Sequence, residues 1–126
     1  MKYFGFYREM PYKVGAQIQA SDLPRSGAAG ESEDVAAYMN GCESLVVVPG
    51  IEQDPYDESQ TVLGGYGLRT DGNWVWPVMA IHLVRKYGLT VPGDFKARMA
   101  SLNYSAPTLA RAEIIEIFKQ AKPELW

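Results

Sequence analysis

The order of apolar and polar positions in the middle of the chain predicts a β-hairpin. Residues 61–69 and 73–76 are rich in β-branched and aromatic side chains, and Asp71-Gly72 lies in the short connection between them. An Asp-Gly pair between two such segments is a strong local signal for a tight antiparallel turn. Trp74 and Trp76 are two positions apart, so they share one face of the second strand, and we expect that face to be buried.

The apolar spacing after the hairpin predicts a helix over residues 78–87. Pro77 suits the start of a helix, because a missing N–H costs nothing there. Gly88 supplies the left-handed residue that commonly ends a helix. His82, Arg85 and Lys86 fall together on the polar face. The apolar face, counted from Trp76, consists of Ala80, Leu83, Val84 and Tyr87.

Three further helices follow from capping residues and apolar spacing. Ser32 can cap a helix over residues 33–39, which the Asn-Gly pair at 40–41 ends. Pro92 begins another helix, and a last helix begins near residues 105–107. We expect the last helix to bury a stripe composed of Ala110, Ile114, Ile117, Phe118 and Ala121.

The remaining segments predict two strands and a turn. Residues 2–8 are aromatic-rich and indicate a strand, and residues 44–48 indicate a buried one. Residues 51–60 contain the short polar side chains and the proline that are typical of turns. Gly64, Gly65 and Gly67 are unusual inside a strand and indicate a bulge or the close approach of another backbone. The order is therefore strand, helix, three strands and three helices.

Segregated strands and helices favour an α+β fold. We expect an antiparallel sheet of three to four strands with about four helices packed mainly on one face. The 126 residues fit one domain, residues 1–126, because a chain of this length buries roughly two-thirds of its unfolded surface. Apolar residues make up 47% of the chain, which is enough for a hydrophobic core.

The acidic residues are unevenly distributed, although the net charge is only −3. Residues 31–60 contain no Lys or Arg but eight of the acids, namely Glu31, Glu33, Asp34, Glu43, Glu52, Asp54, Asp57 and Glu58. Such a run forms either a solvated surface or an electronegative face that attracts a basic partner. Nucleic acid is disfavoured as a partner, because no basic stripe is present and the acids would repel phosphate.

Catalytic and metal-binding signatures are absent from the sequence. The single Cys42 and the single His82 could meet in space, but nothing indicates the third group that orients a catalytic pair. A metal site needs several converging ligands, and the acids at 54, 57 and 58 lack the spacing of a calcium loop. We therefore expect no catalytic residues, no metal and no cofactor, and a protein that is not an enzyme.

The cysteine content and the apolar runs indicate a cytoplasmic protein. A single cysteine cannot form an internal disulfide, which suits a reducing compartment. Arg8 and Glu9 interrupt the start of the chain before a signal peptide could form. The longest apolar run, residues 45–48, is far too short to span a membrane.

The order of several short motifs resembles a family of small bacterial proteins. FYRE at 6–9, VAAYM at 35–39, DPYD at 54–57 and TDGNWVWP at 70–77 are similar to its tyrosine-rich start, its Asp-x-x-Asp loop and its T-D-G-x-W-x-W-P core. Within the helix over 78–87 the chain departs from that pattern: Val78-Met79 replace a polar pair, His82-Leu83 replace an aromatic pair, and Arg85 replaces an acid. That helix is therefore expected to face something different here.

Small acidic proteins of this kind resemble immunity proteins of contact-dependent inhibition and other polymorphic toxin systems. The resemblance implies a non-enzymatic protein that neutralises a cognate basic toxin domain, such as a nuclease, by covering its active site or substrate surface. The partner-binding residues would be Glu52, Asp54, Asp57, Glu58 and Asp71. The alternative is a small-molecule-binding or enzymatic domain that uses the loop carboxylates.

Overall fold

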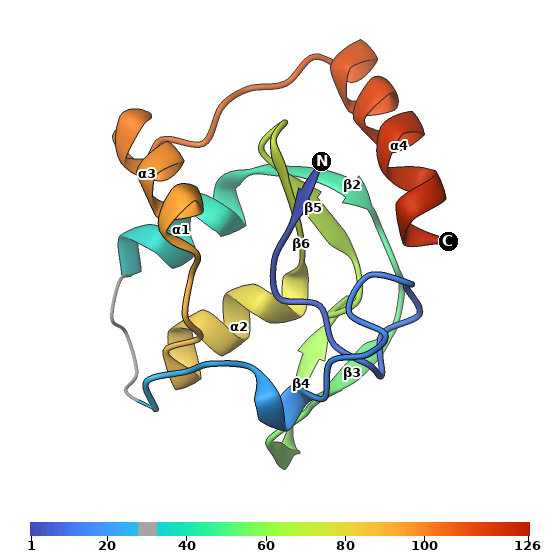
Figure 1. Ribbon diagram of the computed structural model, residues 1–126, viewed down its shortest axis with the longest axis vertical. Helices are drawn as coiled ribbons and strands as arrows, with labels where there is room; N and C mark the ends of the chain where they lie inside the picture. The colour runs from blue at the N-terminus through green and yellow to red at the C-terminus, as the bar shows by residue number, and fades with distance from the viewer. Residues whose placement is uncertain (28–32) are drawn as a thin grey trace.

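Four short strands form the main sheet of the computed structural model, which describes residues 1–27 and 33–126 (Figure 1). Their order across the sheet is β1-β6-β5-β2, and β3 pairs with β4 in a separate two-stranded sheet. The strands are β1 (Lys2–Tyr3), β2 (Glu43–Val46), β3 (Ile51–Asp54), β4 (Asp57–Leu63), β5 (Leu68–Thr70) and β6 (Trp74–Pro77). The helices are η1 (Ala20–Asp22, a 3-10 turn), α1 (Glu33–Gly41), α2 (Val78–Tyr87), α3 (Gly93–Ser101) and α4 (Arg111–Leu125). The fold class is α+β, as predicted.

The β5–β6 hairpin forms where the Asp-Gly pair predicts it, but the predicted strand over 61–69 is divided, because residues 61–63 belong to β4 and only the last part continues into β5. Thr70 pairs with Val75 across the two antiparallel strands, and Gly72 in the turn has a φ of 98° that favours glycine. Both tryptophans are buried, as expected. The Trp74 ring stacks on Phe95 of α3 with centroids 4.6 Å apart, and Trp76 lies 5.2 Å from the same ring. The second strand of the hairpin therefore packs its aromatic residues against α3.

The sheet is mixed, so the prediction of an antiparallel sheet is wrong for one strand pair. β1 runs parallel to β6, with Lys2 beside Trp74. The predicted strand over 2–8 ends at Tyr3, because Gly5 has a φ of +83° and interrupts the extended backbone. A side chain at Gly5 would also place its Cβ 2.5 Å from the Cβ of Ala80, so this segment lies directly against α2.

Residues 51–60 are a hairpin rather than the predicted turn. Only Pro55 and Tyr56 form the connection, and the flanking residues pair as β3 and β4, with Ile51 opposite Leu63. The predicted buried strand over 44–48 is instead β2, none of whose residues is fully buried and which pairs with β5. The expected close backbone approach is confirmed at Gly67, where an added Cβ would lie 3.0 Å from the carbonyl oxygen of Val46.

The helices form where the apolar spacing predicts them, except that α4 begins later in the chain than predicted. α2 begins after Pro77 and ends at Gly88, whose φ of 64° is left-handed, and α3 begins after Pro92. α4 begins at Arg111, not near 105–107, and Ala110 is exposed. Ser32, the predicted cap of α1, lies outside the described residues. The buried residues of α4 are Ile117, Ala121 and Leu125.

Two regions hold the elements together. α1 contacts α2, α3 and β5, and these elements surround the aromatic core. In Figure 1, α4 stands on the other side of the view from α1 and α3, at the end of a long connection. Its C-terminal end is attached to the N-terminal segment, where the Lys13 amide donates to the Leu125 carbonyl and Tyr12 packs edge-on against Trp126.

Candidate functional site

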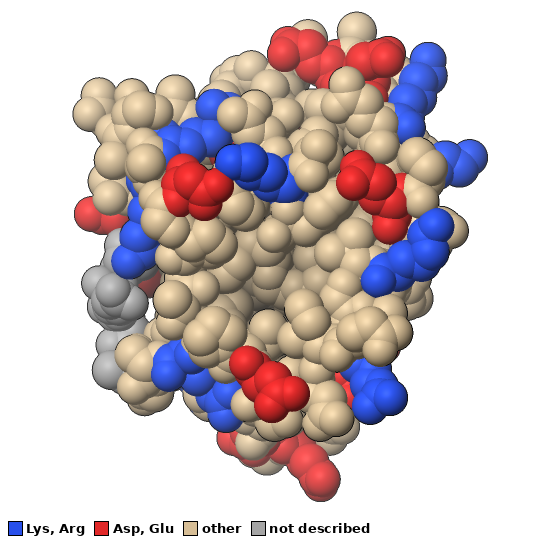
Figure 2. Space-filling view, viewed as in Figure 1, with Lys and Arg blue, Asp and Glu red and all other residues tan. Residues whose placement is uncertain are grey.

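Four of the five predicted partner-binding acids lie on one hairpin. Glu52 and Asp54 belong to β3, and Asp57 and Glu58 belong to β4. Asp71 lies in the β5–β6 turn, which Figure 1 places towards the opposite end of the view. Acidic side chains gather at the lower tip of the molecule in Figure 2, where Figure 1 places the β3–β4 hairpin. The structure therefore brings four of the acids together and leaves Asp71 apart.

Asp71 is a buried structural residue, which does not fit its prediction as a partner-binding residue. Its carboxylate is fully covered and accepts hydrogen bonds from the Tyr38 hydroxyl at 2.6 Å and from Arg98 Nε at 2.9 Å. The amides of Asn73 and Trp74 donate to the same side chain at 2.9 and 2.8 Å. These bonds fix the β5–β6 turn to α1 and α3 and leave no accessible carboxylate surface for a partner.

Asp54 is also buried, which corrects its prediction as a surface contact. Its side chain has no exposed area and accepts hydrogen bonds from the Tyr56 amide at 2.7 Å and the Tyr87 hydroxyl at 2.9 Å. His82 Nε2 lies 2.7 Å from Oδ2. Burial by itself raises the pKa of Asp54, but the hydrogen bonds from His82, Tyr56 and Tyr87 outweigh it, so the pKa lies below its usual value.

Around Asp54, the structure assembles groups that the sequence does not bring together. His82 and Tyr87 come from α2, and Tyr56 comes from the β3–β4 connection. The Tyr56 ring packs edge-on against Tyr87 with centroids 4.9 Å apart, and the Arg25 guanidinium carbon lies 3.9 Å from the centroid of the Tyr56 ring. The only sequence signal was that the hairpin and helix 78–87 each carry polar residues. The cluster anchors the hairpin to α2.

The other three acids of the hairpin remain accessible. Glu58 is exposed, and Glu52 and Asp57 are partly exposed. The Asp57 carboxylate accepts hydrogen bonds from Ser59, and these bonds with the Lys86 ammonium at 3.4 Å hold its pKa below the usual value. Asp57 therefore already has a basic neighbour within the protein. Among the described residues, no hydrogen bond or ion pair engages the carboxylates of Glu52 and Glu58.

A cavity of about 270 Å³ opens beside the hairpin. Three carboxylates and no basic side chain line it, and we call it the acidic pocket. One of the three belongs to Glu9, which sequence analysis did not associate with the hairpin because it lies far away along the chain. The lining residues are Tyr7, Glu9, Ala20, Gln53, Asp54, Pro55, Glu58 and Tyr66.

Exposed apolar side chains lie at the other end of the same hairpin. Ile51 is 64% exposed and its cross-strand partner Leu63 is 78% exposed. Val47, at 80%, lines a common cavity with Leu63. Single exposed apolar residues are ordinary, but a group of three marks a surface that can lose water on binding. We call Val47, Ile51 and Leu63 the apolar patch.

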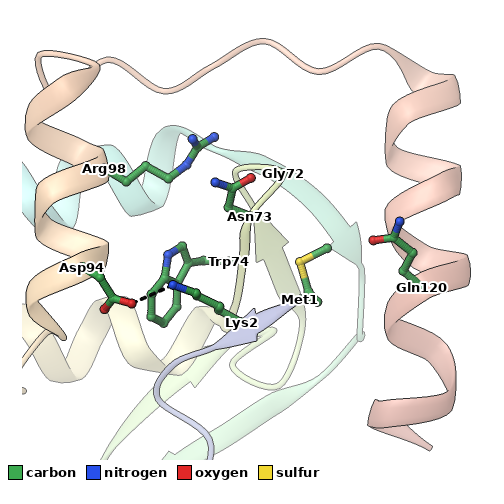
Figure 3. A pocket seen from close by; sticks show the side chains of 8 residues that line it. All are labelled: Met1, Lys2, Gly72, Asn73, Trp74, Asp94, Arg98 and Gln120. Carbon is green, nitrogen blue, oxygen red and sulfur yellow. Dashed lines mark hydrogen bonds and ion pairs between the residues drawn. The ribbon is translucent and has the colours of Figure 1, made fainter.

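A larger cavity of about 390 Å³ lies between the β5–β6 turn, α3 and α4 (Figure 3). Its charged groups are already engaged within the protein: Lys2 forms an ion pair with Asp94 at 2.8 Å, and Arg98 bonds to Asp71. Figure 3 shows Lys2 extending across this cavity over the Trp74 ring towards Asp94. The cavity therefore offers fewer unengaged charged groups than the acidic pocket does.

Cys42 and His82 do not form a nucleophilic pair. The Cys42 thiol is buried and donates to the Tyr38 carbonyl, whereas His82 bonds to Asp54. Burial, together with the nearby Asp71 charge, raises the pKa of Cys42 to about 12, so the sulfur is a thiol at neutral pH. Within the part of the chain that the structure describes, no group of three or more His, Cys, Asp or Glu residues is arranged to hold a metal ion.

Comparisons of the chain with protein-family models, curated proteins and solved structures return no match. Over residues 1–27 and 33–126, none of the helices combines the length and the apolar composition that crossing a bilayer requires.

Proposed function

We propose that the chain is a non-enzymatic binding protein, an immunity protein that acts in the bacterial cytoplasm by covering the active site or substrate surface of a cognate basic toxin domain. The binding surface is the β3–β4 hairpin, with Glu52, Asp57 and Glu58 as its acidic contacts. Asp54 and Asp71 are buried and support this surface and the rest of the fold from inside, so neither is an exposed contact of the binding surface.

The observation that carries this proposal is that the β3–β4 hairpin carries exposed acids and also borders on the apolar patch. The apolar patch supplies area whose burial favours association, and the acids select a basic partner and speed the encounter. Interfaces between proteins commonly combine an apolar centre with a polar rim. The unengaged carboxylates of Glu52 and Glu58 supply charge that no described basic group compensates.

Neutralisation of this kind needs no catalytic group. A protein that covers an active site inhibits by occupancy, so complementarity of shape and charge is sufficient. The anchoring of the hairpin by Asp54, His82 and Tyr87 supports such a role, because a surface held in its bound conformation loses little entropy on association.

Co-purification with the product of the adjacent gene tests this proposal. We expect a stable complex and suppression of that product's toxicity when the two are expressed together. A protein that forms no complex with the neighbouring product and gives no protection would contradict the proposed function.

The alternative is a small-molecule-binding or enzymatic domain, and the Asp54–His82 pair favours it. A buried carboxylate bonded to a histidine that is 24% exposed is the arrangement that orients an imidazole for proton transfer. A thermal-shift screen with metals and metabolites distinguishes the two functions. Under the alternative, a metal or metabolite of the screen raises the unfolding temperature and His82→Ala abolishes that increase. Under our proposal, no compound of the screen causes an increase that depends on His82.

A further inference from the structure

We propose that the acidic pocket is the receptor for a single basic side chain, a lysine or arginine, of the protein partner. This inference rests on the proposed function and specifies which chemical group of the partner the site recognises. The pocket lies where the N-terminal segment, the β3–β4 hairpin and Tyr66 meet, so a side chain inserted there contacts three separate parts of the chain.

The first observation is a buried hydroxyl without a partner. Tyr7 is 1% exposed, and its hydroxyl lies near the Tyr66 side chain but has no partner in good hydrogen-bonding geometry among the described residues. Burial, the neighbouring Tyr66 and the charges of Glu9 and Asp54 raise the pKa of this phenol, and all four residues line the pocket. A buried polar atom without a partner is costly, and an ammonium or guanidinium donor would satisfy it.

The second observation is that the three carboxylates of the pocket differ in how far they are engaged by hydrogen bonds within the protein. Asp54 already accepts hydrogen bonds from three donors, so it contributes a fixed negative charge at the base of the pocket. Glu9 and Glu58 are exposed, and in the described residues their carboxylates make no hydrogen bond or ion pair. These two side chains are therefore free to close on an incoming cation as charge-assisted acceptors.

The size and walls of the pocket fit a side chain better than a bare ion. A cavity of about 270 Å³ exceeds the volume of one metal ion, and the described residues contain no preformed metal-ligand group. The rings of Tyr7 and Tyr66 lie edge to face with centroids 6.5 Å apart. They provide aromatic surface for the methylene groups of a lysine or the plane of a guanidinium. An anion is excluded by the three carboxylates.

Titration with two cationic probes, N-acetyl-lysine amide and N-acetyl-arginine amide, tests the inference. We expect at least one probe to shift the backbone amide NMR signals of pocket residues, with a Kd on the order of millimolar because only one side chain is engaged. The neutral probe, the lysine derivative acetylated on its side-chain amine, should cause no such shifts. A pocket that responds equally to neutral and cationic probes, or to none of them, would overturn the inference.

Substitutions identify the groups involved. Glu9→Gln combined with Glu58→Gln should raise the Kd about tenfold or more, whereas Glu116→Gln on α4 should leave it unchanged. Tyr7→Phe should raise the Kd about three- to tenfold without lowering the unfolding temperature of the free protein, because the lost hydroxyl has no internal partner. A Tyr7→Phe protein that binds normally but unfolds at a lower temperature would show that the hydroxyl is structural and overturn its assigned role.

These probes separate the pocket from the proposed function. If the protein protects against the toxin but the pocket does not bind the cationic probes, the proposed function is retained and the assignment of the pocket is wrong. If the pocket binds the cationic probes but the protein gives no protection, the assignment of the pocket is retained and the proposed function is wrong.

Discussion

His82 Nε2 lies 2.7 Å from Asp54 Oδ2, across a separation of 28 residues in the sequence. This contact joins α2 of the main fold to the β3–β4 hairpin, which forms a separate sheet and, within residues 1–27 and 33–126, does not pair with the main sheet. The hairpin that carries the accessible acids therefore depends on a buried carboxylate for its position. The same residue contributes both to the stability of the fold and to the base of the acidic pocket.

Asp54 should make the protein sensitive to acid. Its folded-state pKa lies below the ordinary value of 3.8, so its stabilising contribution is present above that value and is lost as pH falls through the folded pKa. Asp54→Asn should lower the free energy of unfolding at neutral pH by about 2–3 kcal/mol and flatten its decline below about pH 4. Urea unfolding at a series of pH values measures both effects. An unchanged acid dependence in the variant would contradict this role.

The buried Asp71 and the exposed Asp94 each pair with one basic residue, and they should differ sharply in importance. Asp71→Asn removes a charged acceptor of four hydrogen bonds and should cost about 2–4 kcal/mol of stability. Asp94→Asn breaks the ion pair with Lys2, in which both side chains are more than half exposed, and should cost less than about 1 kcal/mol. Chemical unfolding of both variants at neutral pH provides the comparison; equal losses would contradict it.

Cys42 should be unreactive in the folded protein. Its sulfur is buried and its pKa is raised to about 12, so almost no thiolate is present at neutral pH. We expect a thiol reagent such as Ellman's reagent to modify the native protein slowly and the urea-unfolded protein rapidly. Fast modification of the native protein without unfolding would show that the thiol is accessible and ionised.

Local chemistry made several elements predictable. The Asp-Gly pair and the two tryptophans determine the β5–β6 hairpin because the turn residues and the period-two alternation act within eight residues. Gly88 marks the end of α2 for a similarly local reason, since glycine adopts the left-handed φ without strain. The α+β class follows from the order of such elements.

The remaining features depend on contacts that no local pattern records. Residues 51–60 have little apolar alternation, because their two-stranded sheet leaves most side chains exposed. The pattern therefore gave no sign of the two strands, and the turn-forming residues predicted a turn instead. The parallel pairing of β1 with β6 joins distant parts of the chain. For the candidate site, the sequence indicated the acidic segment over 52–58, but it could not distinguish the buried Asp54 from the exposed Glu58, because only the fold brings His82 and Tyr87 to Asp54.

The affinity of the complex with the cognate toxin tests the central claim most directly. We predict that Glu52→Lys combined with Glu58→Lys weakens binding about hundredfold or more and reduces its dependence on salt, because attraction to a basic surface becomes repulsion. The control, Asp34→Lys combined with Glu116→Lys, makes the same change in net charge on exposed residues of α1 and α4 and should bind almost normally. A folded hairpin variant that retains the parent affinity and salt dependence would contradict binding through the β3–β4 hairpin.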